Sequence, residues 1–180
     1  PVAVLCTSGS ALLNYYPAIA EAFYSDIPLV VLSADRPFYK IDIGDGQTIR
    51  QDHVFDRHIG YSANLKLDVI HATETIRNQG KGLISVTIPI ETQQAAVELF
   101  NAQELEKAIK TAIFSSAPVH INIPFEEPLY GTTLTPNKQH NNDLVKPVEE
   151  SLDTLDDYVS LWNSAQRKLV LVGVNNPNSV

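Results

Sequence analysis

Three short segments combine residue types that can bind an anion or a small polar ligand. Cys6–Ala11 (C-T-S-G-S-A) passes through small residues into a helical pattern, and Ser33–Pro37 (S-A-D-R-P) carries an arginine after an apolar run. Gly44–Gln51 (G-D-G-Q-T-I-R-Q) is a glycine-flanked polar loop. Backbone N–H groups at a helix start attract anions, and a guanidinium holds a carboxylate with two hydrogen bonds. The three segments therefore predict an anion-binding crevice.

Spacing alone leaves a structural interpretation of each segment open. Ser10 can cap a helix after a turn made by Gly9. Arg36 can form a surface pair with Asp35, and Gln47 can be a solvated loop residue. The turn at Gly9 lacks the lysine of a P-loop, the spacing of G-x-G-x-x-G and the G-x-S-x-G pattern of hydrolases. Those three kinds of site are therefore not expected.

Most other titratable and aromatic side chains are interpreted as structural. His53 and His58 stand five residues apart with the surface charges Asp52 and Asp56 beside them, so no metal-ligand set is completed. The expected roles are a hydrogen-bonded core histidine for His120, a buried thiol for Cys6, packing for Tyr15 and Tyr16, and solvated charge for Glu126 and Glu127.

The elements that must position these segments alternate between strands and helices. Nearly continuous apolar runs predict strands buried on both faces, as in a parallel sheet, at Val2–Cys6, Pro28–Ser33, Pro118–Ile123 and Lys168–Val174. Leu83–Ile90 is a fifth candidate, which Pro89 restricts to an edge or terminal position. Helical spacing predicts helices over Ala11–Tyr24, which Pro17 kinks or begins, over Asn101–Phe114 with Asn101 as N-cap, and over roughly Leu152–Gln166.

This order of elements predicts an α/β fold with a parallel sheet and more than one domain. The polar segment 132–150 contains two prolines and has no period, which is typical of a linker. We therefore expect one domain over residues 1–131, a linker over 132–150 and the start of a second α/β domain over 151–180. Because apolar strands stand at both ends, we interpret the chain as a piece of a longer protein.

Composition excludes several classes of protein. The 180 residues are 44% hydrophobic, which is too apolar for a disordered chain, yet no apolar run reaches the ~18–20 residues of a membrane span. Thirteen basic and 21 acidic residues give a net charge of -8, which argues against a nucleic-acid partner. One cysteine supports neither a disulfide framework nor a cysteine-rich zinc site. With no leader visible, we expect a cytoplasmic location.

Four ordered motifs resemble one enzyme family. They are Cys6–Asn14 with Tyr16–Ala18, then Ser33–Pro37, Gly44–Gln51 and Val119–Gly131 (V-H-I-N-I-P-F-E-E-P-L-Y-G). The family is the thiamine-diphosphate-dependent 2-succinyl-5-enolpyruvyl-6-hydroxy-3-cyclohexene-1-carboxylate synthases of menaquinone biosynthesis. The resemblance implies that residues 1–131 are the later part of a thiamine-diphosphate pyrimidine-binding domain. It also implies decarboxylation of 2-oxoglutarate, addition of the succinyl unit to isochorismate, and a homodimer or homotetramer.

The resemblance implies roles for six residues. Four of them border the pyrimidine side of the cofactor: Ser8, Gly9, Ser10 and Asn14. Arg36 is implied to face the anionic substrates, and Gln47 is implied to be a catalytic and substrate-binding residue near the reacting carbon. No metal ligand is expected in this chain, since the family binds Mg²⁺ and diphosphate in a C-terminal domain.

The sequence departs from the family in several places. Ser10 stands where threonine is usual and Gly46 where asparagine is frequent, and extra sequence lies between Leu67 and Ala95. The glutamate that activates the cofactor would lie upstream of Val2, so the chain alone is expected to be inactive. Two alternatives stay open. An acetolactate-synthase type enzyme would be expected to show G-P-G-x-x-N and A-F-Q-E, and a non-catalytic module would keep only the sheet.

Overall fold

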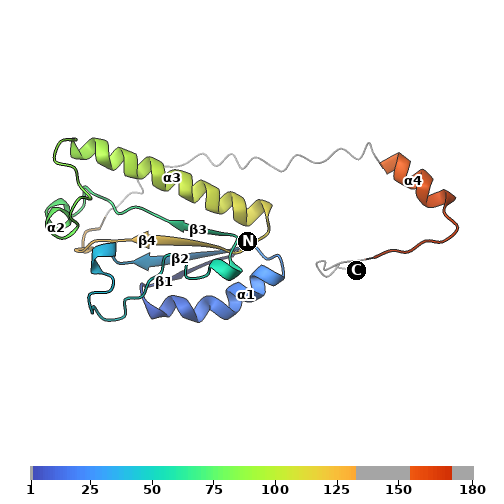
Figure 1. Ribbon diagram of the computed structural model, residues 1–180, viewed down its shortest axis with the longest axis horizontal. Helices are drawn as coiled ribbons and strands as arrows, with labels where there is room; N and C mark the ends of the chain where they lie inside the picture. The colour runs from blue at the N-terminus through green and yellow to red at the C-terminus, as the bar shows by residue number, and fades with distance from the viewer. Residues whose placement is uncertain (1, 133–154, 172–180) are drawn as a thin grey trace. The chain divides into compact units, whose positions relative to one another are not determined.

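Four parallel strands form one sheet in the order β1-β2-β4-β3, which confirms the predicted α/β class (Figure 1). The structure, a computed structural model, describes residues 2–132 and 155–171. The strands are β1 (Val2–Cys6), β2 (Leu29–Asp35), β3 (Tyr61–Asn64) and β4 (Val119–Pro124). The longer helices are α1 (Tyr16–Tyr24), α2 (Thr73–Gln79), α3 (Ile90–Phe114) and α4 (Leu155–Ser164), and 3₁₀ turns are η1 (Ser10–Tyr15), η2 (Phe38–Lys40) and η3 (Asp56–His58).

Helices α1 and α3 cover opposite faces of the sheet (Figure 1). Neighbouring side chains of a strand point to opposite faces, so Val30 packs with Ala108 and Ala112 of α3. The next residue, Val31, packs in a second cluster with Ile19 of α1. Both faces of the central strands are therefore buried, as the apolar run predicted.

Strand β1 corrects the expectation of burial on both faces. It lies at the end of the sheet next to β2, and its side chains Val2 and Leu5 are 62% and 73% exposed. An apolar run alone does not distinguish an edge strand from a central one, because both favour the same β-branched residues. The predicted strand is correct and its predicted burial is wrong.

The region 67–90 also differs from the prediction. Leu83–Ile90 does not form a strand: Val86 is 93% exposed, and α3 begins at Ile90 directly after Pro89. Strand β3, which has the sequence Y-S-A-N, was not predicted because only Ala63 of its four residues is fully buried. Its backbone pairing with β4 holds it in the sheet.

Helix α3 begins eleven residues before the predicted N-cap. Asn101 lies inside the helix, where its side chain accepts a hydrogen bond from the Lys66 N–H (2.7 Å) and donates one to the Lys66 carbonyl (2.9 Å). The asparagine therefore fixes the segment after β3 to the helix. The prediction failed because an asparagine side chain can bond the backbone at a helix start or the backbone of a neighbouring segment, and the sequence does not distinguish these two roles.

The first predicted helix is confirmed in two parts. Ser10–Tyr15 form the 3₁₀ turn η1. The α-helix α1 then begins at Tyr16 with Pro17 in its first turn, where the missing N–H of proline removes no hydrogen bond of the helix. None of the helices in the described residues is long and apolar enough to cross a membrane.

The chain divides into two compact units, Pro1–Thr135 and Pro136–Val180. In the second unit α4 confirms the predicted helix, while residues 168–171 have no regular structure, so the predicted strand Lys168–Val174 is wrong as far as it is described. Residues 133–150 of the predicted linker and 172–174 of that strand lie outside the described residues. The predicted domain boundaries stay predictions.

The close contact of α3 with the sheet gives the first prediction. Ala112 is 1% exposed, so Ala112→Leu must push α3 away from the strands and should destabilise the chain by about 1–3 kcal/mol. Ala102→Leu, at an exposed position of the same helix, should change the free energy of unfolding by less than about 0.5 kcal/mol. Denaturant unfolding measures both, and equal effects would contradict this packing.

Candidate functional site

The three sequence-predicted segments meet at the carboxyl edge of the sheet. Ser8 follows β1 and Arg36 follows β2, and the Arg36 Nη1 donates a hydrogen bond to the Ser8 Oγ (2.5 Å). Arg36 also forms an ion pair with Asp45 of the 44–51 loop, with 3.1 Å between Nε and Oδ2. Among the described residues the Arg36 guanidinium forms these two contacts and no ion pair with the Asp35 carboxylate.

Gly9 makes the turn that follows β1, as predicted. Its φ is +95°, a conformation that a residue with a Cβ rarely adopts, and an added Cβ would overlap the carbonyl oxygen of Gln47. The Gly9 N–H donates to the Gln51 Oε1 (2.6 Å), and its carbonyl accepts from the Leu12 N–H (3.1 Å). The turn is thus packed directly against the 44–51 loop.

The other sequence-predicted residues lie around this turn. Gln47 is exposed, has a φ of +61°, and meets the turn through its backbone. Ser10 is exposed, but Gly9 is the N-cap of η1 and no side chain caps it, so the capping interpretation of Ser10 is wrong. Asn14 is exposed farther along η1, where its Nδ2 donates to the Ala11 carbonyl (3.2 Å). Among the described residues Asn14 forms no hydrogen bond to Arg36 or Gln47.

A buried polar network lies beneath this edge, on the face of the sheet that α1 covers. The Asn122 Oδ1 accepts hydrogen bonds from the Gln51 Nε2 (2.8 Å) and from the Ser33 Oγ (2.9 Å). The Asn122 Nδ2 donates to the Asp35 Oδ2 (2.7 Å), and the Ser33 Oγ lies 2.7 Å from the His120 Nε2. All five side chains are at most 8% exposed.

Sequence reasoning missed this network, although it left a signal. Ser33 and Asp35 on β2, and His120 and Asn122 on β4, are polar residues two positions apart within apolar strands. That period places all four on one face of the sheet. Gln51 ends the polar segment 44–51, and nothing in its spacing indicates that its side chain is buried.

Burial determines the ionisation of two members of the network. It lowers the pKa of His120 to about 4, with a smaller effect from the charge of His53, so this histidine is neutral near pH 7. Burial also raises the pKa of Asp35, and the hydrogen bonds from Asn122 and from the Arg36 N–H oppose that rise. His120 is the hydrogen-bonded core histidine that the sequence predicted.

Glu126 corrects the prediction of solvated charge. It is 2% exposed, and its carboxylate accepts hydrogen bonds from the Tyr39 hydroxyl and the Lys40 ammonium of η2. Burial raises the pKa of Glu126, but the bonds from Lys40 and Tyr39 outweigh it and leave the pKa below its ordinary value. The prediction failed because the lysine that pairs with Glu126 is 86 residues away in sequence. Glu127 is exposed, as predicted.

The remaining candidates are structural. The exposed His53 contacts Asp56 (2.9 Å) and Asp52 (3.3 Å), and in the described part of the chain no group of three His, Cys, Asp or Glu side chains is placed to hold a metal. Tyr16 stacks on Phe55 with 5.3 Å between ring centroids. Tyr15 packs against the cluster beside α1, as predicted, and its hydroxyl donates to the Leu5 carbonyl. Cys6 is only half-buried, which corrects the prediction of a buried thiol, and this burial raises the pKa of Cys6.

A cavity of about 550 Å³ opens at the same edge, next to Arg36. Its polar wall includes Asp35, Asn64 and Asn122, and its apolar wall includes Phe38. Residues 67–95, predicted to be extra sequence, contribute to this wall and have their own apolar cluster of Val69, Ile76 and Ile84. They are therefore a folded part of the candidate site's surroundings.

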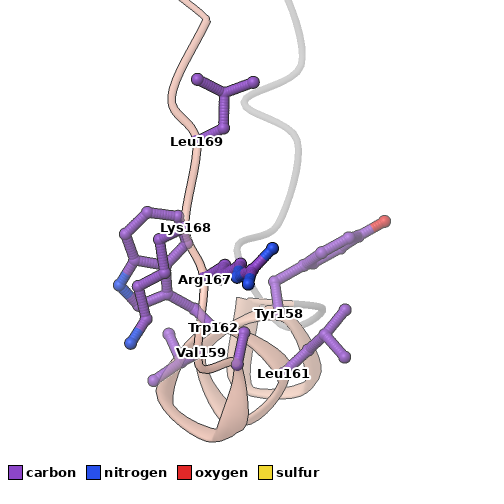
Figure 2. A pocket seen from close by; sticks show the side chains of 8 residues that line it. Tyr158, Val159, Leu161, Trp162, Arg167, Lys168 and Leu169 are labelled. Atoms are coloured by element: carbon purple, nitrogen blue, oxygen red, sulfur yellow. The ribbon is translucent and has the colours of Figure 1, made fainter.

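The second unit has a separate hollow of about 500 Å³ beside α4 (Figure 2). Aromatic and basic side chains line it, and the Lys168 Nζ lies 5.7 Å from the centroid of the Trp162 ring. None of the sequence-predicted site residues belongs to it.

Known proteins similar in sequence agree with the parallel α/β fold. Residues 1–59 match the family model described as thiamine pyrophosphate enzyme, N-terminal TPP binding domain. The matched residues lie within the parallel α/β unit, which is therefore of the N-terminal TPP-binding domain type.

Within that class the chain is homologous to the 2-succinyl-5-enolpyruvyl-6-hydroxy-3-cyclohexene-1-carboxylate synthases. It is 50% identical to the Christiangramia forsetii synthase over 182 residues and 49% identical to the Flavobacterium johnsoniae synthase over 186 residues. Both alignments cover all 180 residues of this chain. The Desulfotalea psychrophila synthase is 39% identical over 96% of the chain. The chain spans 28–30% of the length of these relatives.

The lowered pKa of His120 predicts a pH dependence of stability. A histidine with a pKa near 6.5 in the unfolded chain and about 4 in the fold stabilises the fold fully above pH 6.5, and this contribution is lost as the pH falls toward 4. The difference between the two pKa values corresponds to about 3 kcal/mol.

Replacing that histidine tests the assignment. In His120→Gln the free energy of unfolding should fall less between pH 6.5 and pH 4 than in the unmodified chain, by up to about 3 kcal/mol. His71→Gln, which removes an exposed histidine, is the matched control for the substitution itself. Identical pH curves for His120→Gln and the unmodified chain, measured by urea unfolding, would show that His120 does not titrate in this way.

Proposed function

We propose that the chain forms the pyrimidine-side wall of a thiamine-diphosphate-dependent synthase that decarboxylates 2-oxoglutarate and adds the succinyl unit to isochorismate. The observation that carries the proposal is the meeting of the Gly9 turn, Arg36 and the Gln47 loop at one sheet edge. Support comes from 50% identity, along the whole chain, to a protein named as this synthase.

The residues of the turn fit one side of an aminopyrimidine ring. Gly9 is buried, the Gln47 carbonyl fills the space where its Cβ would stand, and its N–H is bonded to Gln51, so it supports the shape of the turn rather than offering a hydrogen bond. The hydroxyl of exposed Ser10 and the amide of exposed Asn14 supply polar groups on the same helical turn. We assign cofactor contact to Ser8, Gly9, Ser10 and Asn14.

The protein's own residues bind and orient the substrates in this proposal. Thiamine diphosphate, when bound, supplies the electron sink that decarboxylation of a 2-oxo acid needs. Arg36 can hold a substrate carboxylate with its guanidinium, since both proposed substrates are dicarboxylates. Gln47 lies on the loop packed against the turn, so its amide can orient a substrate oxygen without changing its charge.

The rest of the active site belongs, in this proposal, to other segments of the synthase. The described residues hold no set of acidic, histidine or cysteine ligands for a metal, and we assign Mg²⁺ and the diphosphate to a different domain. A homodimer or homotetramer and a cytoplasmic location complete the proposal as predictions from the family resemblance.

A chimaeric synthase tests the proposed function. In it, this chain replaces the matching segment of the Christiangramia forsetii synthase, to which it aligns along its whole length. With thiamine diphosphate and Mg²⁺ the chimaera should convert 2-oxoglutarate and isochorismate to product, while the 180-residue chain alone should show no turnover. Product formation is followed by chromatography.

Single-residue variants of the chimaera complete that test. Arg36→Ala and Gln47→Ala should each lower kcat/KM by about 100-fold, because each removes a positioned group next to the substrate. A folded chimaera that binds no cofactor and forms no product would contradict the proposal and favour the non-catalytic module. Turnover of pyruvate in place of 2-oxoglutarate would favour the acetolactate-synthase type.

The ion pair of Arg36 gives a further prediction. Asp45, 47% exposed at its side chain, occupies a position on Arg36 that a substrate carboxylate would need. Partly exposed pairs contribute about 0.2–1 kcal/mol, so Asp45→Asn in the chimaera should lower KM for at least one dicarboxylate substrate, by up to about fivefold. Asp42→Asn breaks the exposed pair with Arg50 in the same loop and should leave both KM values unchanged. The same KM values in Asp45→Asn and the unmodified chimaera would contradict competition by Asp45.

A further inference from the structure

We propose that Gln51 is a positioning residue for the cofactor-binding turn: its buried amide fixes Gly9 and, through Gly9, the loop that carries Gln47. This inference rests on the proposed function, because it names a residue that acts on that site through its neighbours. Gln51 itself is 0% exposed and therefore has no access to substrate or cofactor.

One end of the Gln51 side chain holds the turn. Its Oε1 accepts the hydrogen bond of the Gly9 N–H, at 2.6 Å, across 42 residues of sequence. Gly9 has a positive φ and no Cβ, so its backbone is the most conformationally free in the turn. A single buried hydrogen bond at this residue therefore selects one backbone conformation out of several that glycine can adopt.

The other end of the side chain is fixed to the central strands. The Gln51 Nε2 donates to the Ala34 carbonyl of β2 (3.0 Å) and to the Asn122 Oδ1 of β4 (2.8 Å). Both N–H groups of the amide are thus used, and the orientation of the amide follows from its partners: a donor at Gly9 and acceptors at Ala34 and Asn122. The Asn122 amide is oriented in turn by the Asp35 carboxylate.

These contacts join three parts of the candidate site through one side chain. The turn after β1, the end of β2 and the end of β4 are separate in sequence, and the Gln51 amide bonds to all three. Gln51 also ends the loop whose Gln47 carbonyl lies against Gly9. Movement of the Gln51 side chain would therefore displace the turn and the loop together.

A second buried glutamine provides a matched control. Gln94 of α3 is 9% exposed, and its Oε1 accepts hydrogen bonds from the backbone N–H groups of Val69 (3.0 Å) and Ile70 (3.4 Å). It holds a different loop by the same chemistry. Methionine has nearly the volume of glutamine and no amide, so Gln51→Met and Gln94→Met remove equivalent hydrogen bonds at two places.

Amide hydrogen exchange of the 180-residue chain tests the contact without reference to catalysis. In the unmodified chain the Gly9 N–H should exchange more slowly than the N–H groups of its neighbours Ser8 and Ser10. In Gln51→Met it should exchange about tenfold faster or more, since it loses a buried acceptor, whereas in Gln94→Met it should not change. Fast exchange at Gly9 in the unmodified chain, or no acceleration in Gln51→Met, would overturn the inference.

Kinetics of the chimaeric synthase test positioning against simple stability. Both methionine variants should lower the unfolding temperature, but Gln51→Met alone should weaken thiamine diphosphate binding and lower kcat, each by about tenfold or more. Equal losses of kcat in the two variants at equal losses of stability would overturn the positioning role.

The two experiments separate this inference from the proposed function. If the unmodified chimaera neither binds cofactor nor turns over, the proposed function fails, and the exchange rate of Gly9 still decides whether Gln51 fixes the turn. If the chimaera is active but Gln51→Met keeps full kcat and cofactor affinity, the proposed function stands and the inference about Gln51 is wrong.

Discussion

The pairing of buried polar groups at the carboxyl ends of β2 and β4 is the constraint on which the candidate site depends. Ser33, Asp35, His120 and Asn122 all lie on one face of two central strands, where an unpaired polar group would cost about 1–3 kcal/mol. Their hydrogen bonds to one another leave acceptors that a loop side chain, Gln51, satisfies. The hydrogen bonds between Gln51 and the ends of β2 and β4 thus fix the position of the loop.

This arrangement explains how a site built from loops can be rigid. The 44–51 loop is largely exposed, Ser8 is half-buried, and glycine at position 9, although buried, would give the turn freedom to move. Their contacts with the buried network and with Arg36 restrict that freedom. A surface formed in this way keeps its shape when a flat, polar ligand binds, since the ordering entropy has already been lost on folding. The site therefore combines exposed groups for binding with buried groups for support.

Much of the fold could be predicted from the sequence, because apolar runs and helical spacing report burial directly. β2, β4 and α1 follow from such patterns, and the meeting of the Gly9 turn with Arg36 follows from the rule that ligands bind at the carboxyl edge of parallel strands. β3 and the early start of α3 could not be predicted, because a strand of four residues with one fully buried side chain forms no apolar run, and because Asn101 can bind another segment. The burial of Glu126 and Gln51 depends on partners distant in sequence, which no local pattern reports.

The central claim is that the Gly9 turn forms the wall against which the cofactor's pyrimidine ring binds. A crystal structure of the chimaeric synthase with thiamine diphosphate and Mg²⁺ tests it most directly. The account predicts the aminopyrimidine ring in van der Waals contact with the Ser8–Ser10 turn, with the Gln51 amide still bonded to Gly9 beneath it. A ring bound elsewhere, with this turn facing solvent, would contradict the account.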